Sequence, residues 1–123
     1  SPAEAWADAL KEYNDPAKRS PKLLSDRSRA FLESFEAAKR EAAPEDGLAL
    51  GNMYAQVGRA AESLASYRLA FTCERLDKPL RAQAAIAPWG EAVRDAGLVG
   101  SLVARWRPAF ATAGQRSCTG GHT

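Results

Sequence analysis

The chain contains few of the residues that build β-sheets, metal centres or membrane spans. Isoleucine occurs once and valine four times among its 123 residues, and no stretch alternates apolar with polar side chains. Because β-branched residues favour strands, this composition argues against a sheet. One histidine, His122, and two cysteines are too few for a clustered metal site. No apolar run is long enough to span a bilayer, so we expect no membrane segment.

Catalytic patterns are missing as well. His122 lies in a polar stretch near the carboxyl end with no ordered nucleophile nearby, so we expect no catalytic triad. The glycines do not have the spacing of a phosphate-binding loop or a dinucleotide fingerprint. Glu45 and Asp46 are paired acids, but their place before a helical run favours a role at the helix dipole. We predict that the chain is not an enzyme and holds no cofactor.

The charge of the chain is nearly balanced. The formal net charge is +2, which is too small to indicate nucleic acid or an anionic membrane by itself. Residues 1–46 carry a net charge of −2, and residues 47–123 carry +4. The basic half includes Arg94, Arg105 and Arg107, but it lacks a dense basic stripe with interleaved aromatic residues. Nucleic-acid binding therefore ranks last among the functions we consider.

The cysteines and the first residue leave the compartment open. Cys73 and Cys118 either close one disulfide in an oxidising compartment or stay free in a reducing one. The chain opens on Ser1 rather than methionine, as a processed product or an excised domain would. No secretory apolar segment is visible, and we slightly prefer the cytoplasm.

The residues that are abundant favour helices. Alanine makes up about a fifth of the chain, with many leucine, arginine and glutamate residues. We therefore predict an all-α chain. Its first helix begins with a capping box, in which Ser1 and Glu4 satisfy the first backbone amides. Trp6, Leu10 and Tyr13 follow at helical spacing and form one apolar stripe.

Five more helices are expected. The second lies within residues 20–43, with Ser20 or Ser25 as its cap and a buried face that includes Leu24, Phe31, Phe35 and Ala38. Gly58 is expected to have the left-handed conformation that ends a helix, and Pro88 to kink or split the helix around it. The other ranges are 47–57, 60–76, 80–97 and 98–112, followed by a flexible tail at 113–123.

Six helices with short breaks suggest three antiparallel hairpins, at about 1–43, 45–76 and 79–112. The second and third hairpins share a pattern when Gly51 is placed on Gly90. Gly58 then falls on Gly97, Tyr67 on Trp106 and Ala70 on Ala109. The first glycine of each unit is expected to let its two helices approach closely, and the second to form the turn.

The stretch LGNMYAQVGRAAESLASYRLA closely resembles a tetratricopeptide repeat over residues 45–76. The resemblance is carried by Leu50-Gly51, Tyr54, Gly58, the small Ser63, Tyr67 and Ala70. Residues 85–112 resemble a degenerate copy, and the first hairpin fits least well. The resemblance implies that residues 1–112 form one domain, a short helical solenoid in which stacked hairpins bury a shared core.

Proteins of this family are mostly interaction modules, whose first helices line a concave groove for a peptide or a helix. The resemblance therefore implies that the chain is an adaptor for a protein partner. The implied partner-binding residues are Leu48, Asn52, Ala55, Gln56, Glu91, Arg94 and Asp95, with Lys11 and Asn14 as weaker candidates. Asn52 matches one residue of the family's carboxylate clamp, but Leu48 and Glu91 replace two others, so we predict no clamp. A structural domain that mediates self-association is the alternative.

Overall fold

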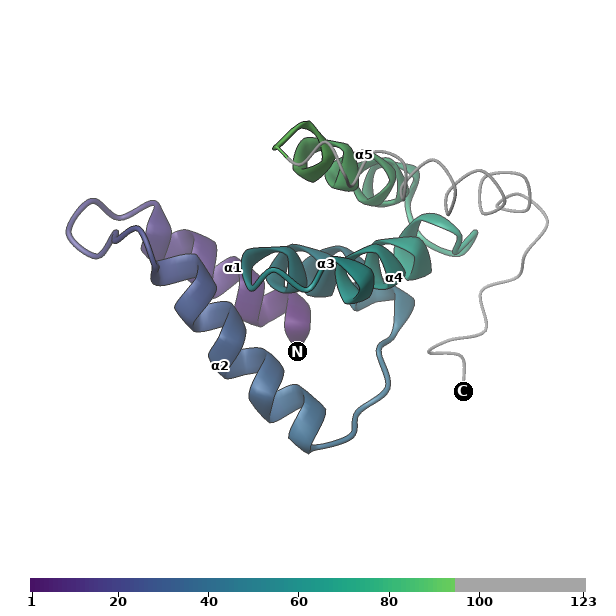
Figure 1. Ribbon diagram of the computed structural model, residues 1–123. Helices are drawn as coiled ribbons and strands as arrows, with labels where there is room; N and C mark the ends of the chain where they lie inside the picture. The colour runs from purple at the N-terminus through teal and green to yellow at the C-terminus, as the bar shows by residue number, and fades with distance from the viewer. Residues whose placement is uncertain (95–123) are drawn as a thin grey trace.

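The computed structural model describes residues 1–94, and every regular element in this range is a helix (Figure 1). The prediction of an all-α chain is therefore confirmed for the range described. The elements are, in chain order, α1 (Pro2–Tyr13), α2 (Leu23–Ala37), the 3₁₀ turn η1 (Pro44–Asp46), α3 (Gly47–Gln56), α4 (Ala60–Phe71) and α5 (Lys78–Arg94).

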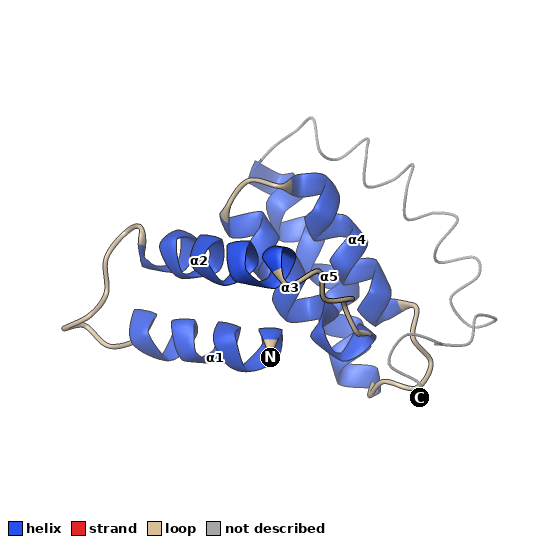
Figure 2. Cartoon of the chain, turned by 90° about the horizontal axis from the view of Figure 1, so that it is seen from below, coloured by secondary structure: helices blue, strands red, loops and turns tan. Residues whose placement is uncertain are grey.

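α3 is the central helix of the fold. It packs against α4, and it also contacts α1, α2 and α5. α1 and α2 lie side by side, and the loop that joins them lies away from the other helices (Figure 2). α1 contacts α3, and α3 contacts α5, so the three odd-numbered helices follow one another in space.

The first helix forms as its sequence predicts. Ser1 is the N-cap of α1, and its Oγ accepts a hydrogen bond of 3.3 Å from the backbone amide of Glu4. Pro2 occupies the first turn, where its missing amide hydrogen leaves no bond unmade. The helix ends at Tyr13, one residue before the polar break that begins with Asn14.

The second helix differs from the prediction at its start and in its buried face. Its N-cap is Lys22, which makes no side-chain capping bond, so neither Ser20 nor Ser25 caps it. The hydroxyl of Ser25 instead donates to the carbonyl of Lys22. The buried residues are Leu23, Ser28, Leu32 and Phe35, whereas Phe31 and Leu24 are half-buried and Ala38 is exposed. The face is rotated because α2 packs against both α1 and α3, and contacts with two neighbours outweigh one apolar stripe.

The turn between α3 and α4 confirms the role of its glycine. Gly58 has a φ of 78°, the left-handed region that favours a residue without a Cβ. α3 ends at Gln56 as expected, but α4 ends at Phe71 rather than near residue 76. The chain then forms a turn in which the amide of Leu76 donates to the carbonyl of Cys73.

The fifth helix begins at Lys78, directly after Asp77, and continues through Pro88. Of the two outcomes expected at Pro88, a kink or a split, the split is therefore not found. Proline provides no backbone donor for the helix, but the ring of Pro88 is buried, and its packing holds it in place within α5. No helix within residues 1–94 is both long enough and apolar enough to cross a membrane. The expected helix at 98–112 and the tail at 113–123 lie outside the described residues.

Two apolar clusters form the core of residues 1–94, and α3 contributes to both. The first lies between α2 and α3 and consists of Leu32, Phe35, Ala49, Leu50, Met53 and Tyr54, with Trp6 of α1 packed against it. The second joins α4 to α5 through Leu64, Ala70, Phe71, Cys73, Leu76 and Ala84. Leu48 of α3 packs against this second cluster.

Cys73 is one of the most buried side chains of the second cluster, with 1% of its surface exposed. Its sulfur takes part in a disulfide bond, and it has no titratable thiol. Of the two alternatives that the sequence leaves open for this residue, the disulfide is the one found. Cys118 lies outside the described residues.

Candidate partner-binding surface

The close contact between α3 and α4 sets the position of the predicted surface. A Cβ placed on Gly51 would overlap the ring of Tyr67, so only glycine allows this approach. The hydroxyl of Ser63 donates to the carbonyl of Gly51 at 2.8 Å, and both residues are buried. The expected close packing at Gly51 is thus confirmed, with the small and the aromatic residue of α4 in the predicted places.

Three of the predicted residues share one face of α3. Leu48, Asn52 and Ala55 are spaced four and three residues apart, which places them on one side of a helix, and all three are half-buried. Gln56 follows and is exposed. Leu48 packs against the cluster between α4 and α5, so it is partly a core residue. The polar part of this face consists of Asn52 and Gln56.

Asn52 is held by a hydrogen bond that the sequence did not indicate. The hydroxyl of Tyr67 donates to Oδ1 of Asn52 at 2.7 Å. The amide nitrogen of Asn52 donates to no other residue in the part of the chain that is described. Because the oxygen is engaged, the carboxamide is fixed in orientation, and its two N–H donors remain available to a ligand.

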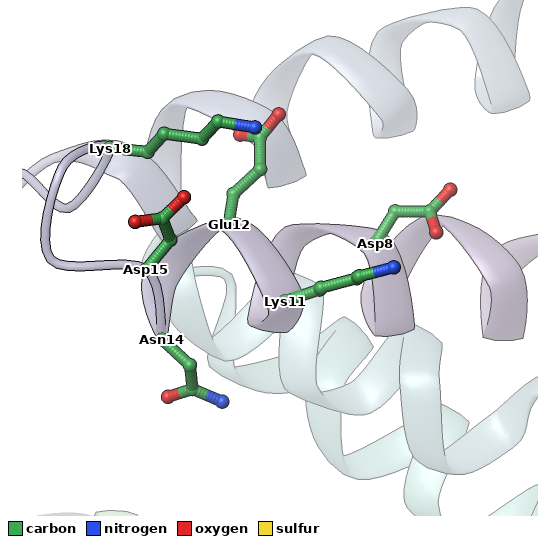
Figure 3. Close-up of a pocket in the computed structure, with 6 residues that line it drawn as sticks. All are labelled: Asp8, Lys11, Glu12, Asn14, Asp15 and Lys18. Atoms are coloured by element: carbon green, nitrogen blue, oxygen red, sulfur yellow. The ribbon is translucent and has the colours of Figure 1, made fainter.

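The weaker candidates on α1 lie in a separate hollow of about 530 Å³ (Figure 3). It is open to solvent and is lined by Asp8, Lys11, Glu12, Asn14, Asp15 and Lys18. All six belong to α1 or to the turn that follows it, and no residue of α3 lines it. The structure therefore does not bring Lys11 and Asn14 together with Asn52 and Gln56 in this hollow.

The candidates of the third hairpin are placed only in part. Glu91 and Arg94 belong to the last turns of α5, but their side chains are not among those described. Asp95 lies outside the described residues. A Cβ on Gly90 would have no described atom within 4 Å, and the helix expected to approach Gly90, residues 98–112, lies outside the described residues.

A second hollow, of about 350 Å³, was not expected from the sequence. It lies among α2, the following loop, α3 and α4, and it is lined by Phe35, Ala42, Leu50, Tyr54, Glu62, Ala65, Ser66 and Leu69. The sequence contains one indication of this hollow, because Leu69 is apolar but does not lie on the stripe that Leu64, Tyr67 and Phe71 form in α4. Leu69 is 38% exposed.

One ion-pair cluster lies beside this hollow and consists of Arg59, Glu36 and Glu62. Both terminal nitrogens of Arg59 donate to the Glu36 carboxylate at 2.8 Å, a bidentate pair. Its Nε donates to Glu62 at 2.6 Å. The guanidinium also lies 4.8 Å from the ring centroid of Tyr54, a cation–π contact. We call Arg59, Glu36 and Glu62 the Arg59 cluster.

The Arg59 cluster shifts the titration of its members. The hydrogen bonds from Arg59 hold the pKa of Glu36 below its ordinary value. The two carboxylates raise the pKa of Arg59, chiefly through its hydrogen bonds to Glu36 and Glu62. Burial raises the pKa of Tyr54, and the negative charge of Glu36 adds to this shift. Elsewhere, burial raises the pKa of Asp46.

Residues 1–94 contain no group of three or more side chains that could hold a metal ion. No family model, curated protein or solved structure matches the chain. The resemblance to tetratricopeptide repeats therefore rests on the residues of the sequence alone.

Proposed function

We propose that the chain is a helical-repeat interaction module that binds a peptide or a helix of a partner protein along α1, α3 and α5. The observation that carries this proposal is the succession of contacts from α1 to α3 and from α3 to α5. In a stack of hairpins, these are the first helices, and they line the concave side. A binding surface on this side would have α3 at its centre.

The packing of α3 supports the choice of face. The side with Gly47 and Gly51 is filled by α4, and the side with Leu50 and Met53 is filled by the cluster shared with α2. What remains is the face with Asn52, Ala55 and Gln56, which is half-buried to exposed. This face offers donors that suit the backbone carbonyls of an extended peptide.

The same face argues against a carboxylate clamp. Leu48, which stands in the place of the expected lysine, packs against the α4–α5 cluster and offers no charge. Of the clamp positions on α3, Asn52 alone therefore offers a polar group to a carboxyl terminus. We propose that internal peptide segments, rather than free carboxyl ends, are the ligands of this surface.

A displayed library of random peptides, selected on the purified chain, tests this function. Peptides that bind should lose at least tenfold in affinity, about 1.4 kcal/mol, when Asn52 is replaced by glutamate. Ala61 is exposed on α4, away from the proposed face, and Ala61→Glu is the matched control. Equal binding of selected peptides to both variants would contradict the proposed face, and a selection without binders would contradict the function.

Self-association is the second candidate, and exposed apolar side chains favour it. Ile86 of α5 is 67% exposed, and Trp89, one turn further on, is 38% exposed. Large exposed apolar side chains that adjoin on one helix often mark an interface. Sedimentation equilibrium of the full chain and of Ile86→Lys tests this. A dimer that the substitution dissociates would favour self-association, and a monomer in both cases would exclude it.

A further inference from the structure

We propose that the Arg59 cluster is a latch that narrows the range of angles between the α1–α2 hairpin and the α3–α4 hairpin. Glu36 lies in the last turn of α2 and so belongs to the first hairpin. Arg59 and Glu62 lie at the start of α4 and belong to the second. The bidentate pair of Arg59 with Glu36 is therefore a direct polar link between the two units.

Apolar packing joins the two hairpins through α2 and α3, where Leu32 and Phe35 belong to one buried cluster with Leu50, Met53 and Tyr54. α2 packs mainly against α1 and α3, and its contact with α4 is at most slight. The hollow of about 350 Å³ separates Phe35 and Ala42 on one side from Ala65 and Leu69 on the other. Glu62 and Tyr54 line this hollow as well, so the Arg59 cluster spans its edge.

The covalent connection between the hairpins is also weakly constrained. The chain leaves α2 at Ala37 and enters η1 at Pro44, without regular structure between them. Residues 38–41 are exposed, and Lys39 has a φ of 52°, which is uncommon for a residue with a side chain. Since the connection is exposed and a hollow lies between α2 and α4, the bidentate pair adds a direct link there to the packing of α2 on α3.

A latch of this kind can be opened. The side chains of Arg59, Glu36 and Glu62 are 38%, 42% and 43% exposed. Salt screens interactions between exposed charges, with a Debye length that falls from about 8 Å at 0.15 M to about 3 Å at 1 M. The angle between the hairpins should therefore widen or become heterogeneous as the ionic strength rises.

Distance measurements between the hairpins test the latch without any partner, so their failure is distinct from that of the proposed function. Nitroxide labels on non-natural residues at positions 33 of α2 and 68 of α4, both exposed, report the angle by pulsed electron resonance. Glu36→Gln should broaden or lengthen the distance distribution. Glu62→Gln keeps the link between the hairpins and should leave the distribution unchanged. Arg27→Gln breaks an ion pair within the first hairpin and is the second control.

Glu36→Gln and Glu62→Gln each replace one carboxylate by an amide of similar size and leave the contact between Arg59 and the Tyr54 ring in place, so both variants are expected to fold. Circular dichroism checks this, and Arg59→Gln provides an independent removal of the latch. Broadening in Glu36→Gln and Arg59→Gln, but not in the controls, supports the proposal. It is overturned if Glu36→Gln leaves the distribution as it is, or if Glu62→Gln broadens it equally.

Discussion

Buried side chains join the two helices of the α3–α4 hairpin, whereas contacts at the protein surface contribute more to the pairing of α1 with α2. In α4, Ser63, Leu64, Ser66, Tyr67, Ala70 and Phe71 are buried. In α1, only Pro2 and Ala9 are buried. α1 and α2 are linked instead by an ion pair between Glu12 and Arg27, at 3.0 Å on the surface. The comparison teaches that the close approach of Gly51 to Tyr67, and not helix pairing alone, makes a hairpin tight.

The largest expected effect comes from removing an aromatic side chain in each hairpin. Tyr67 is 2% exposed, and Tyr67→Ala should lower the free energy of unfolding by about 3–5 kcal/mol, as aromatic truncations in cores do. Tyr13 is half-buried at the end of α1, and Tyr13→Ala should lower it by about 1 kcal/mol or less. Urea denaturation followed by circular dichroism measures both. Equal losses would break the comparison.

The next effect distinguishes Gly51 from Gly90, which fall on each other when the two stretches of sequence are aligned. Gly51→Ala puts a methyl group into the ring of Tyr67, and we expect a loss of about 1–3 kcal/mol from overpacking. Gly90→Ala meets no described atom within 4 Å, so the higher helix propensity of alanine should stabilise the chain by up to about 1 kcal/mol. Urea denaturation measures both free energies of unfolding. If both substitutions change the free energy of unfolding in the same direction, the two glycines have similar surroundings and the distinction is wrong.

A smaller effect is expected from the hydroxyl that links α4 to α3. Ser63→Ala removes the buried bond to the Gly51 carbonyl, and unfolding free energy should fall by about 1 kcal/mol. Ser25→Ala is the counterpart in the first hairpin, where the hydroxyl donates to Lys22 on a part-exposed turn. Its loss should be about half as large or less. A larger loss for Ser25→Ala than for Ser63→Ala would contradict the contrast between the hairpins.

The smallest effect concerns acid and the link between the hairpins. The pKa of Glu36 in the folded chain is lower than its ordinary value of 4.5. Glu36 therefore stabilises the fold above that value, and this contribution is lost as the pH falls through the lowered folded value. Since the pair is part-exposed, we expect less than about 1 kcal/mol.

The midpoints of urea denaturation at pH 7 and pH 3 show whether the contribution of Glu36 to stability is lost in acid. The midpoint of Glu36→Gln should fall less between these pH values than that of the unaltered chain. Asp46 has a raised pKa and contributes with the opposite sign, but it is present in both proteins, so it cancels in the difference. An equal fall in both proteins would rule out the contribution of Glu36.

Local signals predicted much of the fold in residues 1–94. A capping serine and Pro2 define the start of α1, and Gly58 defines the turn after α3, because each acts on its own backbone. α2 has no such cap, and its buried face depends on contacts with α1 and α3, which lie far from it in sequence. That the helix continues through Pro88 was not predictable for the same reason, because packing around a buried ring is not visible in the sequence.

The candidate surface was predictable as a helix face but not as a set of contacts. The spacing of Leu48, Asn52 and Ala55 places them together on α3, as found. The bond between Tyr67 and Asn52 joins residues 15 positions apart, and only the close approach at Gly51 brings them together. The Arg59 cluster was missed because Glu36 lies 23 residues from Arg59.

The approach of α3 to α4 at Gly51 also limits how this sequence can change over time. The backbone at position 51 and the ring at position 67 occupy adjoining space, so a larger residue at one position requires a smaller one at the other. Homologous chains should therefore vary these two positions as a pair and keep their combined volume nearly constant. An insertion in the exposed stretch at 38–41 touches neither position, and lineages should accumulate length changes there first.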